Sequence, residues 1–373
     1  GSGTSLTMSA ALTVSSDLFV NSTLAMGNNT LTLNGNGAII NGTGSITGSS
    51  TITVSNGKTI SSGTSLTISP TFAIANNTTV TNNGTVTFNG NLTGGNVNST
   101  YVSGSNSITN VNGAFLSTGT LDASAVQNTF NYGSSGAQTI KKANTSYYDL
   151  ICSNAGTKSM NANFVVDNSV TLEGTVVLDE STYIMSGNGD ITMISGTPEL
   201  KMQRSANTTS PELTGTYTLT KGTVTINQTS NTNTVHEATY YNLKLNGSAS
   251  YDMGDVDVIS NDFNISGSSI WTNTSGNTLT VGDSLNFSSS ASSTLTGDVN
   301  VAIFKMTSGT LIDGGNTINL TLGDWTKTGG TFTSTGEIKF TSSSAQNITG
   351  SSATTFNDLT ISNSNGLTLN TAA

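Results

Sequence analysis

The chain has 373 residues and a net charge of −10, with 34% hydrophobic and only 9% charged residues. Arg204 is the only arginine, so nucleic acid is not an expected partner, because phosphate binding needs clustered Lys and Arg. No apolar run approaches the roughly 20 residues of a membrane-spanning helix, so we expect no membrane insertion. The start of the chain lacks a signal-peptide pattern, which fits a mature or excised chain.

Short segments in which apolar and polar residues alternate run along the chain from its start. Such period-two alternation is typical of strands with one buried face. Asn-Gly pairs separate these segments, and both residues tolerate the left-handed backbone of tight turns. Early examples of the strands are Thr30–Asn34, Thr51–Ser55 and Thr85–Asn89. The pattern predicts an all-β protein without sustained helices.

Two all-β architectures fit this pattern. Tandem β-sandwiches would carry a buried Trp or Tyr framework in each domain, and the chain has only Trp271 and Trp325. Short strands with Asn and Gly at the corners and inward aliphatic residues favour an elongated parallel β-solenoid, similar to a β-helix. We expect about 20–25 residues per coil.

The charge distribution divides the chain near residue 130. Residues 1–130 contain only Asp17, Lys58 and Asp122 as charged groups, whereas a soluble surface is normally about 25–35% charged. We therefore predict two solenoid segments, residues 1–130 and residues 131–373. The uncharged segment needs a cover, for which neighbouring subunits, glycans and an ordered surface such as ice or polysaccharide are the candidates.

A short aromatic block occurs three times in the second segment. Each copy contains an aromatic residue, Tyr or Asn, Asp or Asn, Leu, any residue and an apolar residue. We expect the aromatic residues to anchor the packing of coils rather than to stack on sugars, and Cys152 to act as a small buried hydrophobic residue. The structural positions of the repeat are Tyr147, Leu150, Cys152, Tyr240, Leu243, Leu245, Phe356, Leu359 and Ile361.

The regions around this block are also related. Ala137–Ile140 precedes the first copy and Ala345–Ile348 the third, with Thr234 and Val235 as a weaker counterpart before the second. Blocks of this kind, followed by Asn-Gly and Leu-Thr-Leu, resemble repeats of large secreted microbial surface proteins. The resemblance covers mainly residues 130–370 and implies a parallel β-solenoid of adhesin or cell-envelope type. It also implies an extracellular location, but no activity.

Asn-x-Ser/Thr sequons are frequent, as the composition alone would produce. On an exported chain, glycans at these positions would make the uncharged segment more soluble. The candidate acceptors in that segment are Asn21, Asn28, Asn41, Asn76, Asn77, Asn83, Asn91 and Asn98. Later candidates are Asn144, Asn207, Asn227, Asn246, Asn264, Asn286 and Asn319.

Thr-x-Thr pairs place two threonines on one face of a strand. Stacked on successive coils, they could form a flat lattice that binds ice, although outward threonine is ordinary on a β-surface. The uneven spacing of the pairs favours the ordinary interpretation. The pairs are Thr30 with Thr32, Thr51 with Thr53, Thr85 with Thr87, and Thr223 with Thr225.

The chemistry-bearing residues are few. Asp252, Asp255, Asp257 and Asp262 form the densest acidic cluster, which we interpret as an exposed edge rather than a calcium site. Asp255 and Asp257 are expected on one face. His236 is the only histidine. A Ser-His-Asp triad or a histidine zinc site therefore has no second candidate histidine in this chain. The sequence predicts no enzyme and no cofactor.

These observations together favour a structural subunit of an extracellular filament, sheath or surface layer. Its expected partners are other copies of the same chain, joined through β-strand contacts, and surface polysaccharide is a further candidate. The alternative is a monomeric adhesin or carbohydrate-binding stalk on a cell surface.

Overall fold

The computed structural model describes residues 5–203 and 209–371; Arg204 and Asn207 lie outside this part. The described chain is all-β and forms a β-solenoid of about 18 turns, in which parallel strands stack on one another. The predicted fold class is thereby confirmed. No helix long and apolar enough to cross a membrane occurs in the described residues.

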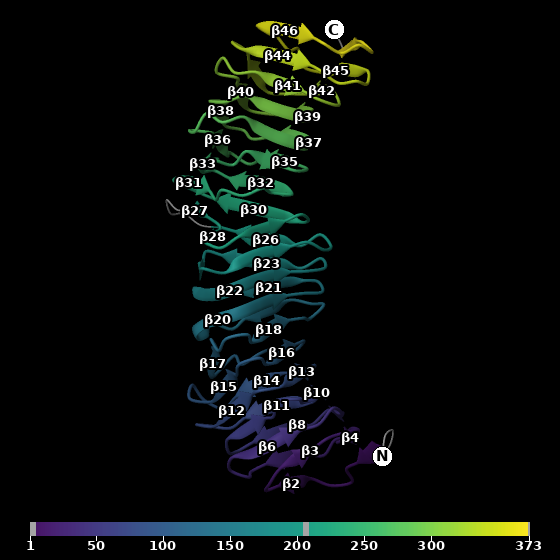
Figure 1. Ribbon diagram of the computed structural model, residues 1–373, viewed down its shortest axis with the longest axis vertical. Helices are drawn as coiled ribbons and strands as arrows, with labels where there is room; N and C mark the ends of the chain where they lie inside the picture. The colour runs from purple at the N-terminus through teal and green to yellow at the C-terminus, as the bar shows by residue number, and fades with distance from the viewer. Residues whose placement is uncertain (1–4, 204–208, 372–373) are drawn as a thin grey trace. The chain divides into compact units, whose positions relative to one another are not determined.

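The chain divides into two compact units, and within each the strands lie side by side in a stack (Figure 1). The first unit contains residues 1–192 and 213–216, and the second contains residues 193–212 and 217–373. The charge boundary near residue 130 therefore lies inside the first unit.

Most strands contain three to five residues. In the first half of the chain they are β1 (Ser5–Thr7), β2 (Leu12–Val14), β3 (Leu18–Phe19), β4 (Thr23–Ala25), β5 (Leu31–Leu33), β6 (Ala38–Asn41), β7 (Ser45–Thr47), β8 (Thr51–Val54), β9 (Lys58–Ile60), β10 (Ser65–Ile68), β11 (Thr71–Ile74), β12 (Thr79–Asn82), β13 (Thr85–Phe88), β14 (Leu92–Gly94), β15 (Thr100–Ser103), β16 (Ile108–Val111), β17 (Thr120–Ala123), β18 (Thr129–Tyr132), β19 (Gln138–Ile140), β20 (Ala143–Cys152), β21 (Thr157–Met160), β22 (Phe164–Leu172), β23 (Val177–Ser181), β24 (Met185–Gly187) and β25 (Asp190–Met193).

The remaining strands follow the same pattern. They are β26 (Glu199–Met202), β27 (Thr209–Ser210), β28 (Glu212–Leu213), β29 (Tyr217–Leu219), β30 (Thr223–Gln228), β31 (Thr232–Val235), β32 (Asn242–Gly247), β33 (Ser250–Asp252), β34 (Val258–Ile259), β35 (Phe263–Ile265), β36 (Ile270–Thr272), β37 (Leu279–Phe287), β38 (Ser292–Thr294), β39 (Val299–Met306), β40 (Thr310–Ile312), β41 (Ile318–Leu320), β42 (Trp325–Lys327), β43 (Thr331–Thr333), β44 (Glu337–Phe340), β45 (Gln346–Gly350), β46 (Asp358–Ile361) and β47 (Leu367–Thr371).

Each regular turn of the first unit contributes three strands to three faces, as β11, β12 and β13 illustrate. Each of these strands pairs in parallel with a strand of the turn before and of the turn after. Equivalent residues on successive turns are 21 or 23 residues apart at the Asn131–Asn110 and Asn112–Asn89 contacts. This spacing agrees with the coil length expected from the sequence.

Period-two alternation explains why these short segments form strands. In β13 the side chains of Val86 and Phe88 are fully buried, while those of Thr85 and Thr87 are half-buried on the outer face. The register with β16 places Val86 opposite Thr109 and Phe88 opposite Val111. Because the inward positions coincide from turn to turn, a thin apolar core runs along the stack.

Asn and Gly occupy the corners, as predicted. The Asn82 side chain accepts a hydrogen bond from the backbone N–H of Gly84 at 3.0 Å. Asn77 and Asn106 adopt positive φ angles of 55° and 60°, a conformation that asparagine tolerates better than most residues. The corner residues therefore turn the chain without interrupting the stacking.

Aromatic side chains form a continuous row in the core of the first unit. Tyr101 packs edge to face against Phe115 with ring centroids 5.6 Å apart, and Phe115 against Phe130 at 4.9 Å. Phe130 continues to Tyr147 at 5.7 Å. Edge-to-face pairs at these distances contribute about 0.5–1.5 kcal/mol each beyond the area they bury. The row therefore ties several turns together.

The second unit repeats the three-face arrangement with its own core. One face is built by β26, β30, β32 and β35, and a second by β27, β31, β33 and β36. The fully buried Trp325 stacks on Phe304 with ring centroids 4.0 Å apart and packs edge to face on Phe332 at 4.8 Å.

Candidate functional site

The structure places the three copies of the aromatic block in different surroundings. Every structural position of the first two copies is fully buried, which accounts for Tyr147, Leu150, Cys152, Tyr240, Leu243 and Leu245. In the third copy, Phe356 is half-buried and packs on Trp325, but Leu359 and Ile361 are 44% and 53% exposed. Their strand β46 pairs with β44 alone among the described strands, so it lacks a cover on one side.

The aromatic residue of the first two copies has a hydrogen-bonding role. The Tyr147 hydroxyl donates to the backbone carbonyl of Lys141, and the Tyr240 hydroxyl donates to the carbonyl of His236 at 2.7 Å. Both motif tyrosines thus hold the corner that precedes them. The buried phenols bind backbone, so they offer no surface on which a sugar could stack.

A glutamine performs the same task before the first and the third copy. Gln138 Nε2 donates to the carbonyls of Val111 at 3.0 Å and Gly113 at 2.9 Å. Gln346 Nε2 donates to the carbonyls of Leu320 at 3.1 Å and Gly323 at 2.8 Å. The sequence similarity of Ala137–Ile140 and Ala345–Ile348 is therefore explained by a glutamine side chain that donates hydrogen bonds to backbone carbonyls of the previous turn.

Sequence reasoning missed three buried lysines. The side chains of Lys58, Lys158 and Lys327 are 3%, 0% and 3% exposed, and burial lowers the pKa of each amine. Lys158 Nζ donates to the carbonyls of Ser134 at 2.7 Å and of Gly136 and Ala155 at 3.0 Å. These amines satisfy corner carbonyls that no strand pairs with, and no sequence pattern distinguishes them from surface lysines.

A hollow of about 510 Å³ opens on the side of the first unit. It lies where the face formed by β2, β5, β8, β11 and β14 gives way to β19. The intervening turn forms only an isolated bridge there, between Leu92 and Phe115. The hollow is lined by Asn112, Gly113, Ala114, Phe115, Ser117, Ala137, Gln138, Thr139, Lys141 and Asn161.

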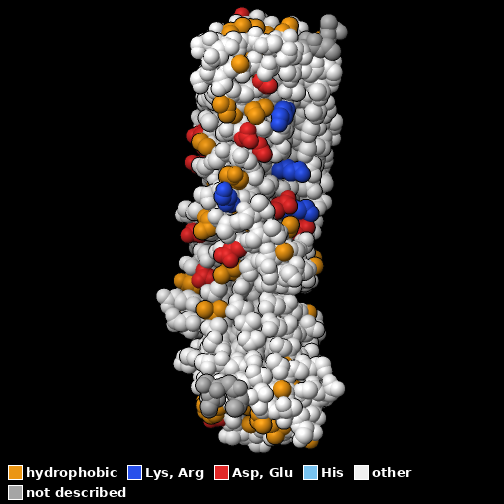
Figure 2. Space-filling model, turned by 90° about the vertical axis from the view of Figure 1, so that its right-hand side faces the viewer, with side chains coloured by type: hydrophobic (Ala, Val, Ile, Leu, Met, Phe, Trp, Pro, Cys, Tyr) orange, Lys and Arg blue, Asp and Glu red, His pale blue; other side chains and the backbone are white. Residues whose placement is uncertain are grey.

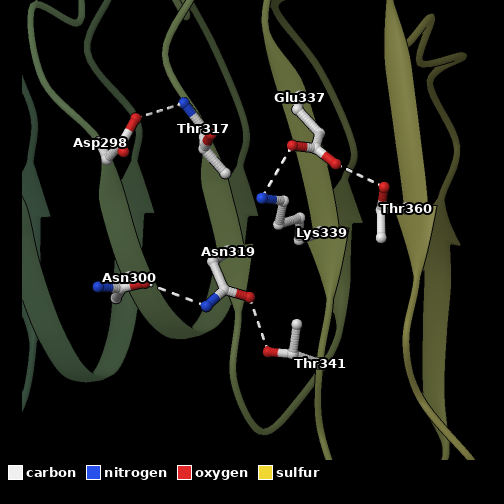
Figure 3. Close-up of polar contacts among 8 residues, drawn as sticks. All are labelled: Asp298, Asn300, Thr317, Asn319, Glu337, Lys339, Thr341 and Thr360. Atoms are coloured by element: carbon white, nitrogen blue, oxygen red, sulfur yellow. Dashed lines mark hydrogen bonds and ion pairs between the residues drawn. The ribbon is translucent and has the colours of Figure 1, made fainter.

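Rows of polar side chains run along the outer faces. On the second unit, Asn300, Asn319 and Thr341 form one chain of side-chain hydrogen bonds, with contacts of 3.1 and 2.7 Å (Figure 3). Beside it, Glu337 forms an ion pair with Lys339 at 2.9 Å. These rows satisfy the side chains turn by turn and leave a flat polar surface.

The threonine pairs lie on different faces. Thr32 pairs with Thr53 in register and with Thr13 on the other side, but Ala73 follows Thr53 on the next turn. Thr85 and Thr87 lie on another face of the first unit, where Ile108 and Asn110 are their neighbours.

In the second unit, Thr225 is 4% exposed and donates a hydrogen bond to Glu199 at 2.6 Å. The pairs therefore do not combine into one lattice, and outward threonine on a β-surface describes them.

The acidic cluster around residue 255 combines two exposed aspartates, Asp255 and Asp257, with two half-buried ones, Asp252 and Asp262. Asp255 lies in a turn and Asp257 in the link that leads to β34, and both are exposed on either side of the buried Val256. Asp252 accepts hydrogen bonds from Thr274 and from the N–H of Gly254. Burial raises its pKa, but these bonds outweigh burial and lower it. In the described residues, no three His, Cys, Asp or Glu side chains gather into a candidate metal site.

His236 and Cys152 both have structural surroundings. The His236 imidazole stacks on Tyr217 with ring centroids 4.2 Å apart, and burial lowers its pKa although Glu237 opposes the shift. Cys152 is fully buried, and burial raises the pKa of its thiol to about 12 although Lys158 opposes the shift. A thiol in this state is protonated and unreactive at neutral pH.

Most candidate glycan acceptors of residues 1–130 are accessible. Asn21, Asn28, Asn76, Asn91 and Asn98 are exposed, and so is Asn77, whereas Asn41 and Asn83 are half-buried. The Asn98 amide nitrogen donates to Asn77 at 3.0 Å, which a glycan on Asn98 would displace. Glycosylation of these positions stays a prediction.

The surface of residues 5–130 carries even less charge than the sequence indicates. The amine of Lys58 is directed to backbone carbonyls, which leaves the exposed Asp17 and the half-buried Asp122 as the remaining charges. Both carboxylates accept backbone N–H groups, from Ile39 and Ser124. The face in Figure 2 shows charged side chains over the half towards the C-terminus and almost none over the turns nearest the N-terminus.

Comparison of the chain with models of known protein families, with curated proteins and with solved structures gave no match.

Proposed function

We propose that the chain is a non-enzymatic structural subunit of an extracellular filament, sheath or surface layer, and that its copies associate through β-sheet faces. The observation that carries this proposal is the nearly uncharged outer surface of residues 5–130, where the one lysine amine is withdrawn from solvent and Asp17 and Asp122 are the only carboxylates. Like charges keep soluble proteins apart, and this surface has almost none. Flat polar faces of this kind can approach closely with little desolvation of charge.

We assign the contact between copies to a row of threonines on the face formed by β2, β5, β8, β11 and β14. Thr13, Thr32, Thr53 and Thr93 stand in register on β2, β5, β8 and β14, with Ala73 between the last two. Their small hydroxyl side chains leave the face even. They also offer hydrogen bonds to a facing chain.

The test is to place charge on this row. The double variant Thr32→Lys/Thr53→Lys puts two ammonium groups in register, and facing copies would then repel one another. We expect wild-type chains to form regular filaments, tubes or sheets in electron micrographs and the variant to need at least about tenfold more protein to do so.

The matched control is Thr326→Lys/Thr349→Lys. These threonines also pair in register and are half-buried, but they lie on the charged second unit. The control should assemble like wild type. Isolated single chains at high concentration, or equal effects of the two double variants, would contradict the proposal.

A monomeric adhesin or carbohydrate-binding stalk is the second candidate function. The hollow beside Lys141 favours it, because a concave site of about 510 Å³ lies within the roughly 300–1,000 Å³ of small-molecule sites.

A further inference from the structure

We infer that the hollow beside Lys141 binds an acidic saccharide, with the carboxylate of a hexuronate residue paired to the Lys141 ammonium group and the sugar hydroxyls bound by the neutral polar side chains around it. This inference does not depend on self-assembly. It gives the second candidate function its ligand class.

The hollow exists because the chain leaves the regular strand path at one turn. Phe115 and Leu116 are neighbours in sequence, yet both are buried, at 6% and 0% exposure. A strand cannot direct two successive side chains inward. Leu116 achieves this with a positive φ of 48°, which is unfavourable for a bulky residue.

The third copy of the repeat provides an internal comparison. There the strand that begins with the bridging Gln346, β45, pairs with β42 through Trp325 and Thr326. In the first copy, β19 begins with Gln138, but no backbone hydrogen bond joins it to residues 112–119 within the described chain. The strand that begins with glutamine is thus paired with the previous turn in the third copy, whereas in the first copy it is unpaired there and leaves the hollow open.

The lining of the hollow has the chemistry of a site for an anionic sugar. Lys141 is its only charged member, and none of the lining residues is acidic. Lys141 forms no ion pair within the described residues, so its ammonium group can accept a carboxylate in a charge-assisted hydrogen bond. Asn112, Ser117, Thr139 and Asn161 offer neutral donors and acceptors for hydroxyl groups.

The position of Lys141 is fixed from beneath. Its backbone N–H donates to the Tyr132 hydroxyl at 2.9 Å, and its carbonyl accepts from the Tyr147 hydroxyl. The two phenol oxygens are 3.1 Å apart, and both side chains are fully buried. This buried network holds the lysine backbone in place at the rim, so little ordering is needed when a ligand binds.

Digalacturonate and its dimethyl ester are the probes, titrated calorimetrically into the whole chain. The ester keeps the sugar hydroxyls but has no negative charge. We expect digalacturonate to bind and the ester to bind at least about tenfold more weakly, because the ester cannot form the charge-assisted bond.

Two variants locate the site. Lys141→Gln should weaken digalacturonate binding at least about tenfold, whereas the adjacent and exposed Lys142 is the matched control, and Lys142→Gln should change it less than about twofold. Ala137→Trp fills the hollow from an exposed position and should abolish binding of both probes. Circular dichroism spectra that match wild type verify that the variants fold.

Several results would overturn the inference. Equal affinity for digalacturonate and its ester would remove the role of the carboxylate. Equal losses from Lys141→Gln and Lys142→Gln would indicate diffuse attraction rather than a site. The absence of digalacturonate binding at millimolar concentration, or binding of an acidic peptide in its place, would exclude the saccharide.

Discussion

Single polar residues inside the corners carry much of the order in this protein, and Asp313 is the clearest case. Its buried carboxylate accepts backbone N–H groups from Gly315 at 3.1 Å, Thr335 at 2.8 Å and Gly336 at 3.1 Å. The Thr335 hydroxyl donates to the same oxygen at 3.0 Å. One side chain therefore joins two successive turns.

Asp313→Asn should lower the free energy of unfolding by about 1–3 kcal/mol at pH 7, because charge-assisted bonds become neutral ones. Burial raises the pKa of Asp313, but the bonds outweigh it and lower the pKa below its ordinary value of 3.8. Its contribution is therefore complete above about pH 4 and lost as the pH falls below that value.

Urea unfolding at pH 7 and pH 3 measures both effects. The difference in the free energy of unfolding between pH 7 and pH 3 should be smaller for Asp313→Asn than for wild type. Asp298→Asn is the control, since Asp298 is exposed and accepts one backbone bond, from Thr317 at 2.7 Å (Figure 3). Similar destabilisation by both variants would show that the buried network has no special weight.

At the scale of the strand and its corner, the same position recurs two residues before β12, β16 and β18. Asn77, Asn106 and Gln127 occupy it, with positive φ angles of 55°, 60° and 60°. Asparagine adopts this left-handed conformation more readily than glutamine, because its short side chain can hydrogen-bond to the local backbone. Gln127 thus departs from the rule that its neighbours follow.

Gln127→Asn should therefore stabilise the protein, by about 0.5 kcal/mol. Gln127 is exposed, so the change removes little packing. The urea midpoint should rise slightly, and the reverse change Asn106→Gln should lower it by a similar amount. A lower midpoint for Gln127→Asn would mean that the backbone angle does not limit stability at this corner.

Strands and corners could be predicted from sequence because their causes are local. Val86 and Phe88 alternate with Thr85 and Thr87, and that alternation alone orients the strand. The hollow could not be predicted in this way. It depends on the backbone angle of Leu116 and on the register of Gln138 with the previous turn, and both are set by packing between distant segments. The buried lysines were missed because lysine is rarely buried without an acidic partner.

Over the whole molecule, burial of phenol groups makes stability depend on alkaline pH. Tyr101, Tyr132 and Tyr147 in the first unit and Tyr240 and Tyr251 in the second are fully buried, and burial raises the pKa of each. Unfolded tyrosine ionises near pH 10, where these folded phenols keep their protons. Their contribution is therefore complete below about pH 10 and lost as the pH rises above it.

The urea midpoint should consequently be level from pH 7 to about pH 9 and fall steeply towards pH 11.5, since each retained proton costs up to about 1.4 kcal/mol per pH unit. Tyr101→Phe removes one phenol, whose oxygen lies 3.0 Å from the Thr109 hydroxyl. Above about pH 10, the free energy of unfolding of Tyr101→Phe should fall less steeply with pH than that of wild type, by the contribution of one tyrosine. This holds even if the variant is less stable at pH 7. A midpoint that stays constant up to pH 11.5 would mean that the phenols ionise without unfolding the coils. The fall of the urea midpoint at alkaline pH therefore tests whether the core stays closed around the buried phenols. In the first unit these include Tyr132 and Tyr147, which hold the backbone of Lys141. In the second unit they are Tyr240 and Tyr251.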